Sequence, residues 1–264
     1  TRMRFPERAI PKGLKGTFTK MGELDVEVAK TLTELLRTES VDTARVRIRA
    51  EIRTGLAQVM LAASGENSIV VHAGANASLS AEDVVRDLPE AIVYLAQLET
   101  PLETIEAFFE AASQVGGCRV LNTAPAVTGS ERLLPLADVL IMNATELAYY
   151  AGHAGAVSAA QVRRLGPRLL QRPQQALIVT LGAEGAWIFT HTSEEFIPAT
   201  PTTVLDTTGA GDCFTGVLVA GLALGQVLPE AARRASRAAS IAVTRLGAAT
   251  SMPRVQELTA SDSH

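Results

Sequence analysis

Residues 204–216 read Val-Leu-Asp-Thr-Thr-Gly-Ala-Gly-Asp-Cys-Phe-Thr-Gly, an apolar run followed by a small-residue turn and a carboxylate. Apolar residues then recur at intervals of three and four, which predicts a helix that opens near Ala210. Backbone N–H groups at a helix opening lie at the positive end of the helix dipole, and glycines leave them accessible to an anion. The stretch therefore predicts an anion site at Gly209, Ala210 and Gly211, with the carboxylate of Asp212 beside it.

This combination suits the transfer of a phosphoryl group to an alcohol. The reaction needs donors for the charge on the moving phosphoryl group, and a base that orients and deprotonates the hydroxyl. The alternative is a common Gly-rich turn before a helix, with Asp212 as an ordinary helix-capping residue. A bare Gly-x-Gly-Asp pattern would favour that alternative, but the full run of residues 206–212 followed by an apolar helix is much less expected by chance.

Composition limits the function classes. With 264 residues, 47% of them hydrophobic, the chain suits one large α/β domain or two small ones. The formal net charge is −4 and no basic block occurs, so we expect no nucleic-acid partner. No apolar run approaches the roughly 20 residues that span a bilayer, and two cysteines give no disulfide framework. The expectation is a cytoplasmic protein that acts on small molecules away from membranes.

From Ser80 onward, predicted helices alternate with short apolar strands. The predicted strands are 91–95, 118–121, 139–142 and 176–180, and the helices before them are 81–88, 101–114, 129–136 and 161–170. An antiparallel pair at 186–189 and 195–197 and two helices at 210–224 and 230–246 follow. Strands that are apolar on both faces are typical of a buried parallel sheet, so this order predicts an α/β fold with a doubly wound, mostly parallel sheet flanked by helices.

The segment before Ser80 predicts a helix at 22–37 and extended segments within 41–52, 54–61 and 68–72. Residues 1–15 show no period and are interpreted as an irregular lead-in. We therefore expect a single domain over 16–264.

The carboxyl ends of the predicted strands carry polar residues, which is where ligands bind in such sheets. Asn143 and Glu146 are spaced either to hold waters around Mg²⁺ or to form a helix capping box, and alone the capping box would be favoured. Residues 181–185 contain two glycines that can bring backbone close to a nucleotide, or can form a plain turn. Glu99 can accept hydrogen bonds from sugar hydroxyls, or can cap the helix that begins at Pro101.

Taken together and in order, these segments resemble the ribokinase/pfkB family of carbohydrate kinases from about Gly16 to Pro253. The motifs that carry the resemblance are HAGAN at 72–76, QLE at 97–99, NATE at 143–146, TLGAEG at 180–185, DTTGAGD at 206–212 and AVTRLGA at 242–248. The resemblance implies an ATP-dependent kinase that transfers the γ-phosphate to the primary hydroxyl of D-ribose and gives D-ribose 5-phosphate.

The resemblance also implies roles for single residues. Asp212 would be the catalytic base and contact the substrate, Gly209, Ala210 and Gly211 would form the anion hole, and Glu99 would bind the sugar. ATP would be bound by Asn143, Thr180, Leu181, Gly182, Ala183, Glu184, Gly185, Gly211 and Ser236. Ser236 departs from the His or Asn that the family often has there, which would weaken the contact with adenine. Glu146 would hold Mg²⁺ through water, and K⁺ would be held by Asp206, Thr208, Ala242, Arg245, Gly247 and Ser251.

The same resemblance leads us to expect that this sequence lacks some family segments. Members begin with a strand that carries a substrate-binding Asp, followed by lid strands and a Gly-Gly-Lys-Gly-x-Asn turn. The Lys-Gly-Leu-Lys-Gly at 12–16 is not accepted as a substitute for that turn, so we expect a β lid reduced to residues 41–61, with a possible homodimer through it. Two alternatives follow: a kinase of another sugar or a nucleoside, and a nucleotide-binding protein without sugar turnover.

Overall fold

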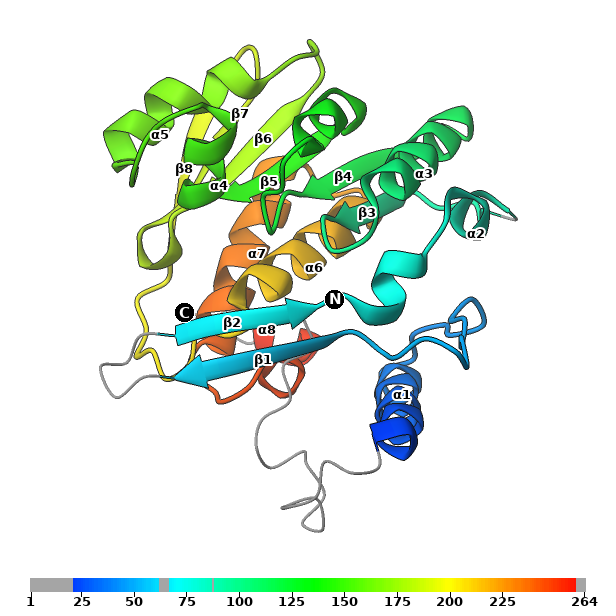
Figure 1. Ribbon diagram of the computed structural model, residues 1–264. Coiled ribbons are helices and arrows are strands. Elements are labelled where there is room, and N and C mark those ends of the chain that lie inside the picture. Colours follow the sequence, from blue (N-terminus) through cyan, green and yellow to red (C-terminus); the bar gives the residue numbers. More distant parts are fainter. Residues whose placement is uncertain (1–20, 62–66, 87, 260–264) are drawn as a thin grey trace. The chain divides into compact units, whose positions relative to one another are not determined.

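The computed structural model describes residues 21–61, 67–86 and 88–259, which form two compact units divided in the sequence between Leu79 and Ser80. The larger unit is built on a six-stranded sheet with the order β3-β4-β5-β6-β7-β8 (Figure 1). Its strands are β3 (Val93–Gln97), β4 (Cys118–Asn122), β5 (Val139–Asn143), β6 (Ala176–Thr180), β7 (Gly185–Phe189) and β8 (Glu194–Pro198). Strands β3 to β6 are parallel, and the last two pairings, of β6 with β7 and of β7 with β8, are antiparallel, which confirms the predicted mostly parallel sheet.

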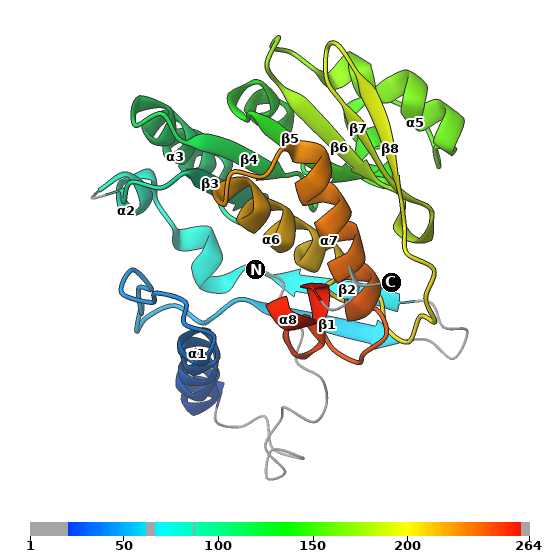
Figure 2. The ribbon, with the colours of Figure 1, turned by 180° about the vertical axis from the view of Figure 1, so that it is seen from behind.

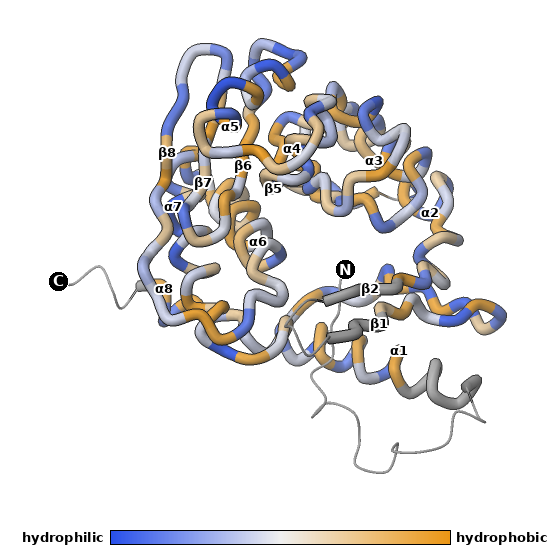
Figure 3. Tube along the Cα trace, turned by 60° about the vertical axis from the view of Figure 1, so that its left-hand side comes forward, coloured by the Kyte–Doolittle hydropathy of each residue, from blue (hydrophilic) through white to orange (hydrophobic). Residues whose placement is uncertain are grey.

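Helices cover both faces of this sheet (Figures 1 and 2). One face packs against α3 (Leu102–Gln114), α4 (Ala144–Tyr150) and α5 (Ala159–Leu165), and the other against α6 (Ala210–Ala223) and α7 (Leu228–Ala242). The tube in Figure 3 shows hydrophobic colours along β6 and α6. The sheet is therefore doubly wound, as predicted.

The central strand β5 shows why the apolar runs are continuous. Successive side chains of a strand point to opposite faces of the sheet. Leu140 and Met142 pack in the core under α3 to α5, whereas Val139 and Ile141 pack in the core under α6 and α7. Because both faces are covered, all four side chains are buried and no polar residue can alternate with them.

Several element boundaries differ from the predicted ones for local reasons. Helix α2 (Ala81–Val85) is shorter than the predicted 81–88. The segment 130–136 is a 3₁₀ helix that contains Pro135, and α5 gives way at Gly166 to a 3₁₀ turn over Gly166–Leu169. Proline lacks the N–H that a regular α-helix needs, which explains the irregular geometry at Pro135 and Pro167.

The smaller unit contains α1 (Met21–Thr38), an antiparallel pair β1 (Leu56–Leu61) and β2 (Asn67–His72), and the 3₁₀ turn Gly74–Ser78. Helix 22–37 and the strands at 54–61 and 68–72 are confirmed. The extended segments expected within 41–52 are wrong, because those residues lie in turns and irregular backbone. The preference of a residue for strands reflects how its side chain packs against neighbours. The side chain of Ile48 is 80% exposed, so it gains little from such packing. The lid function of residues 41–61, which include β1, stays a prediction.

The predicted lead-in 1–15 and the Lys-Gly-Leu-Lys-Gly at 12–16 lie outside the described residues. The expectation of one domain over 16–264 stays a prediction. Within the part of the chain that the structure describes, no helix has the length and hydropathy needed to cross a membrane.

Candidate active site

The small-residue turn ends at the opening of α6, where the sequence predicts it. Gly209 is the N-cap residue and has φ of +77°, a left-handed conformation that residues with a Cβ disfavour. A Cβ at this position would also lie 3.2 Å from the Cα of Ala248, which is tighter than ordinary packing. Gly209 is therefore required both by the backbone and by the close approach of a second segment.

The donors of the predicted anion hole are not equivalent. The Ala210 N–H already donates to Thr207 O at 3.2 Å, so an anion would have to share that donor. Gly211 is exposed, and a Cβ there would meet nothing within 4 Å among the described atoms. The open side of the turn is thus at Gly211 and Asp212, the first exposed residues of α6.

Asp212 and its neighbour Cys213 have opposite surroundings. Asp212 is exposed in the first turn of α6, whereas Cys213 is only 3% exposed. Burial, reinforced by the charge of Asp212, raises the pKa of the Cys213 thiol from 9.0 to about 11. Because the thiolate is the nucleophilic form, the Cys213 thiol is unreactive near neutral pH. The role of Asp212 as the catalytic base stays a prediction.

Asp206 ties the turn to the segment after α7. Its Oδ1 accepts from the Thr208 N–H and its Oδ2 from the Gly247 N–H, both at 2.9 Å. The N–H groups of Leu205 and Asp206 both donate to Val243 O. The structure therefore brings three of the predicted potassium residues, Asp206, Thr208 and Gly247, into one hydrogen-bonded group.

The other three predicted potassium residues lie in the segment 242–251, at or after the end of α7. Ala242 is buried at the last turn of the helix, and Arg245 forms an ion pair with Glu257. Ser251 is buried and donates from its hydroxyl to Ala248 O at 2.7 Å. The role of all six residues as potassium ligands stays a prediction.

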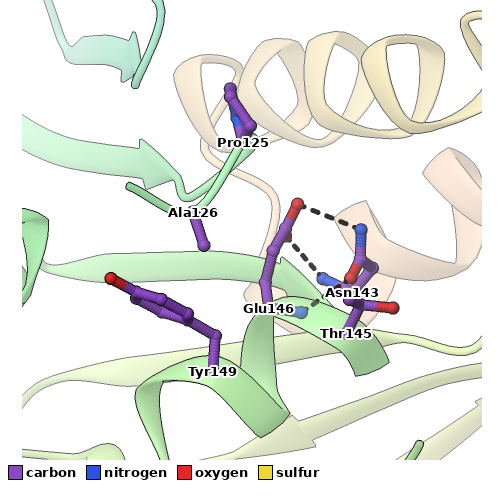
Figure 4. A pocket seen from close by; sticks show the side chains of 6 residues that line it. All are labelled: Pro125, Ala126, Asn143, Thr145, Glu146 and Tyr149. Atoms are coloured by element: carbon purple, nitrogen blue, oxygen red, sulfur yellow. Dashed lines mark hydrogen bonds between the residues drawn. The ribbon is translucent and has the colours of Figure 1, made fainter. Parts of the chain in front are cut away.

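Asn143 and Glu146 form the capping box that the sequence offered as one of two interpretations (Figure 4). The Asn143 side chain accepts from the Glu146 N–H at 2.9 Å, and Glu146 Oε2 accepts from the Asn143 N–H at 2.9 Å. Asn143 Nδ2 also donates to Glu146 Oε1 at 3.0 Å. The two side chains are held rigidly, and Glu146 is only 7% exposed.

This capping box borders a cavity of about 340 Å³. The cavity is lined by Pro125, Ala126, Asn143, Thr145, Glu146 and Tyr149 (Figure 4). Among the described residues, no group of three or more His, Cys, Asp or Glu side chains could hold a metal ion. The single carboxylate of Glu146 suits the usual binding of Mg²⁺, which keeps several waters and uses one or two carboxylates together with phosphates of a nucleotide. The magnesium role of Glu146 stays a prediction.

The glycine turn predicted to line a nucleotide connects β6 to β7. Thr180 pairs with Asn143 across the strand ends, and its hydroxyl donates to Met142 O at 3.4 Å. Leu181, Gly182, Ala183 and Glu184 form a tight turn in which the Leu181 N–H donates to Gly185 O. A Cβ at Gly185 would lie 2.1 Å from Ile197 O, so packing on β8 requires that glycine. Gly182, Ala183 and Glu184 are exposed, but the Glu184 N–H donates to Leu181 O and its carbonyl accepts from the Ala199 N–H. The role of this turn in binding a nucleotide stays a prediction.

The last two predicted site residues are Glu99, just after β3, and Ser236, on α7. Glu99 follows β3, and Gln97 Nε2 donates to its carboxylate at 3.1 Å. Ser236 is 8% exposed on α7 and donates from its hydroxyl to Pro198 O at 3.4 Å.

The sequence analysis missed Asn122 and Thr123, at the carboxyl end of β4. Asn122 Nδ2 donates to Thr215 Oγ1 at 3.2 Å, and Thr123 Oγ1 lies 3.3 Å from Glu146 Oε2. A signal was present, because these two polar residues follow an apolar run at the same sheet edge as Asn143 and Thr180.

The segment of the chain that resembles known proteins includes all residues of this site. Residues 25–255 match the model of the pfkB family carbohydrate kinases. The ribokinase of Haemophilus influenzae is 35% identical over 239 residues, which are 87% of this chain and 76% of that protein.

Solved structures of ribokinases resemble the fold of this chain. Ribokinase from Cryptococcus neoformans var. grubii in complex with ADP has a TM-score of 0.77 and 30% identity, over 88% of this chain and 78% of its own. Arabidopsis thaliana ribokinase complexed with ribose and ATP has a TM-score of 0.69 and 29% identity, over 78% of this chain and 68% of its own. Every predicted site residue, from Glu99 to Ser251, falls within the matched residues 25–255.

Proposed function

Because the chain belongs to the pfkB family of carbohydrate kinases, we propose that it transfers the γ-phosphate of ATP to the primary hydroxyl of D-ribose. In this reaction the sugar oxygen forms a bond to the γ-phosphorus, the bond from that phosphorus to the β–γ bridging oxygen breaks, and ADP and D-ribose 5-phosphate are released. The observation that carries the proposal is the open helix start at Gly211 with the exposed carboxylate of Asp212 in its first turn. The similarity to ribokinases solved with ADP and with ribose and ATP supports the choice of substrates.

Asp212 would orient the sugar hydroxyl and take its proton. The amides of Gly209, Ala210 and Gly211 would stabilise the charge on the phosphoryl group as it moves. Because Gly209 and the Asp206 contacts fix the conformation of this turn, the donors would need little reorganisation during the reaction.

The ligands would be divided between neighbouring strand ends. Glu99 after β3 would bind the sugar together with Asp212. The nucleotide would lie along the remaining positions, which are Asn143, Thr180, Leu181, Gly182, Ala183, Glu184, Gly185, Gly211 and Ser236.

Metal ions form part of the proposal. Mg²⁺ bound with ATP would neutralise phosphate charge, and Glu146 would hold its waters. K⁺ would be held by Asp206, Thr208, Ala242, Arg245, Gly247 and Ser251, next to the anion hole, largely through backbone carbonyls. Asp206 supports this proposal by joining the two segments that would supply the ligands, through its bonds from the Thr208 and Gly247 N–H groups.

We also propose that the protein acts in the cytoplasm and forms a homodimer through the lid segment, residues 41–61. Light scattering after size-exclusion chromatography measures the mass in solution, and a monomer at all concentrations would exclude the dimer.

A coupled assay for ADP release tests the function. The protein is given ATP, Mg²⁺ and K⁺ with D-ribose, and in parallel with 2-deoxy-D-ribose, D-fructose and a nucleoside, against an Asp212→Asn control. We expect the highest kcat/KM with D-ribose. A preference for another compound would reassign the substrate, and ATP binding without turnover above the control would favour a nucleotide-binding role.

A further inference from the structure

Two adjacent side chains at the end of β4 reach opposite faces of the sheet. Side chains alternate along β4: Val120 packs in the core under α6 and α7, and Leu121 packs in the core under α3 to α5. Continuing this alternation, Asn122 contacts α6 and Thr123 contacts Glu146 of α4. One strand end therefore contacts both elements that carry the proposed site.

Asn122 fixes the beginning of α6. Its Nδ2 donates to Thr215 Oγ1 at 3.2 Å, while its Oδ1 accepts from the Ala124 N–H at 3.3 Å. Thr215 is 4% exposed and follows Asp212 by three residues, so it lies one helical turn below the carboxylate on the same side of α6. This hydrogen bond fixes the position of the first two turns of α6 relative to the carboxyl end of β4.

Thr123 fixes the Glu146 carboxylate. Its side chain is fully buried, and Oγ1 lies 3.3 Å from both Ile141 O and Glu146 Oε2. Ile141 O already accepts the Thr123 N–H at 2.9 Å. A hydroxyl has one hydrogen to donate, and a carboxylate is the stronger acceptor, so the hydroxyl serves Glu146.

We propose that Asn122 and Thr123 are positioning residues for phosphoryl transfer, which set Asp212 and the α6 amides relative to Glu146 without touching a substrate. The proposal rests on the kinase reaction proposed above. Reaction rates are sensitive to this kind of placement, because a shift of about 1 Å in a reacting group can reduce a rate on the order of 100-fold.

Paired variants separate positioning from stability. Thr123→Val and Thr215→Val keep the shape of the side chain and remove the hydroxyl, while Thr123→Ser and Thr215→Ser keep the hydroxyl. Gln175→Ala is the matched control, because Gln175 is 1% exposed and donates to Leu134 O and Ala137 O at 2.7 Å, near the amino-terminal edge of the sheet. Each protein is measured for its melting temperature, its dissociation constant for MgATP by calorimetry without sugar, and its kcat and KM.

We expect Thr123→Val to weaken MgATP binding roughly tenfold, since a hydrogen bond to a charged group is lost, with most of the affinity retained in Thr123→Ser. Thr215→Val should lower kcat roughly tenfold with a nearly unchanged MgATP dissociation constant, and Thr215→Ser should restore kcat. Gln175→Ala should lower only the melting temperature.

The proposal is overturned if the valine variants lower only the melting temperature, as the control does. If Thr123→Val or Thr215→Val does not fold, Thr123→Ala and Asn122→Ala remove the same hydrogen bonds and must give the same losses. If the unmodified protein phosphorylates no sugar, the kinase function fails, while the calorimetric comparison still decides whether Thr123 positions Glu146.

Discussion

Asp212 concentrates the proposed chemistry in one exposed side chain. It sits in the first turn of α6 beside a buried and inert Cys213, with open space in front of Gly211. An exposed residue at this position contributes little to the core, so its replacement separates activity from folding.

Asp212→Asn should abolish most of the turnover and leave the fold intact. An amide cannot take the proton of the sugar hydroxyl, and loss of a general base lowers rates by roughly 10²- to 10⁴-fold. The coupled assay gives kcat, and circular dichroism gives the melting temperature. A kcat within twofold of the unmodified protein would place the base elsewhere.

The two glycines of the turn should respond differently to the same side chain. Gly211→Val puts an isopropyl group into open space, so it should block phosphate binding with a small change in stability. Gly209→Val must adopt a left-handed backbone and press on Ala248, which should cost at least about 1–2 kcal/mol of stability. Calorimetry with ATP and chemical denaturation measure the two effects, and equal destabilisation by both substitutions would contradict this assignment.

At the scale of elements, the helix start at Asn143 combines capping with the proposed nucleotide site. A second capping box with the same geometry occurs at Ser158 and Gln161, at the start of α5. Asn143 and Ser158 are both exposed N-cap residues, so the pair distinguishes what a cap contributes from what a ligand contact contributes.

Asn143→Ala and Ser158→Ala should each reduce the free energy of unfolding by about 1 kcal/mol. Only Asn143→Ala should raise the concentrations of ATP and Mg²⁺ that give half-maximal rate, because only that residue borders the cavity next to Glu146. Initial rates over a matrix of ATP and Mg²⁺ concentrations check this. An unchanged requirement in Asn143→Ala would leave Asn143 with a capping role alone.

The sequence predicts elements well where local signals agree. The predicted strand 176–180 coincides with β6. The predicted start of a helix near Ala210 is also confirmed, because the glycine turn and the spacing of apolar residues both indicate that position. Local patterns fail within 41–52, where Val41, Val46, Ile48 and Ile52 are exposed and the backbone forms turns and irregular structure. The Asn122 contact is also beyond local patterns, because its partner is 93 residues away in the sequence.

At the scale of the larger unit, the carboxyl ends and the amino ends of the sheet strands carry different groups of polar residues. The carboxyl edge carries the predicted ligand-binding residues, while the amino edge carries an ion-pair group in which Asp138 accepts from Arg119 at 2.7 Å and from Arg172 at 2.9 Å. Burial opposes ionisation of Asp138, but the hydrogen bonds from the two arginines outweigh it and lower its pKa. This edge is therefore expected to contribute to stability and not to catalysis.

Asp138→Asn should lower the melting temperature near neutral pH and leave kcat/KM unchanged. A loss of about 1 kcal/mol corresponds to about 2–4 °C for a protein of this size. Because the folded-state pKa of Asp138 is lowered, its contribution is present above its ordinary pKa of 3.8 and is lost as pH falls below it. The difference in melting temperature between the two proteins should be constant near neutral pH and should narrow as the pH falls below 3.8, and a difference that does not narrow there would contradict the ion-pair explanation.

The bond between Asp206 and the Gly247 N–H has a consequence for biosynthesis. The two residues are 41 positions apart, and the later one stands behind all of α7. A nascent chain leaves the ribosome from its amino end, so the proposed phosphate-binding turn lacks this hydrogen bond until residue 247 has emerged. Chains arrested before that point should contain all six strands of the β3–β8 sheet but lack part of the proposed site.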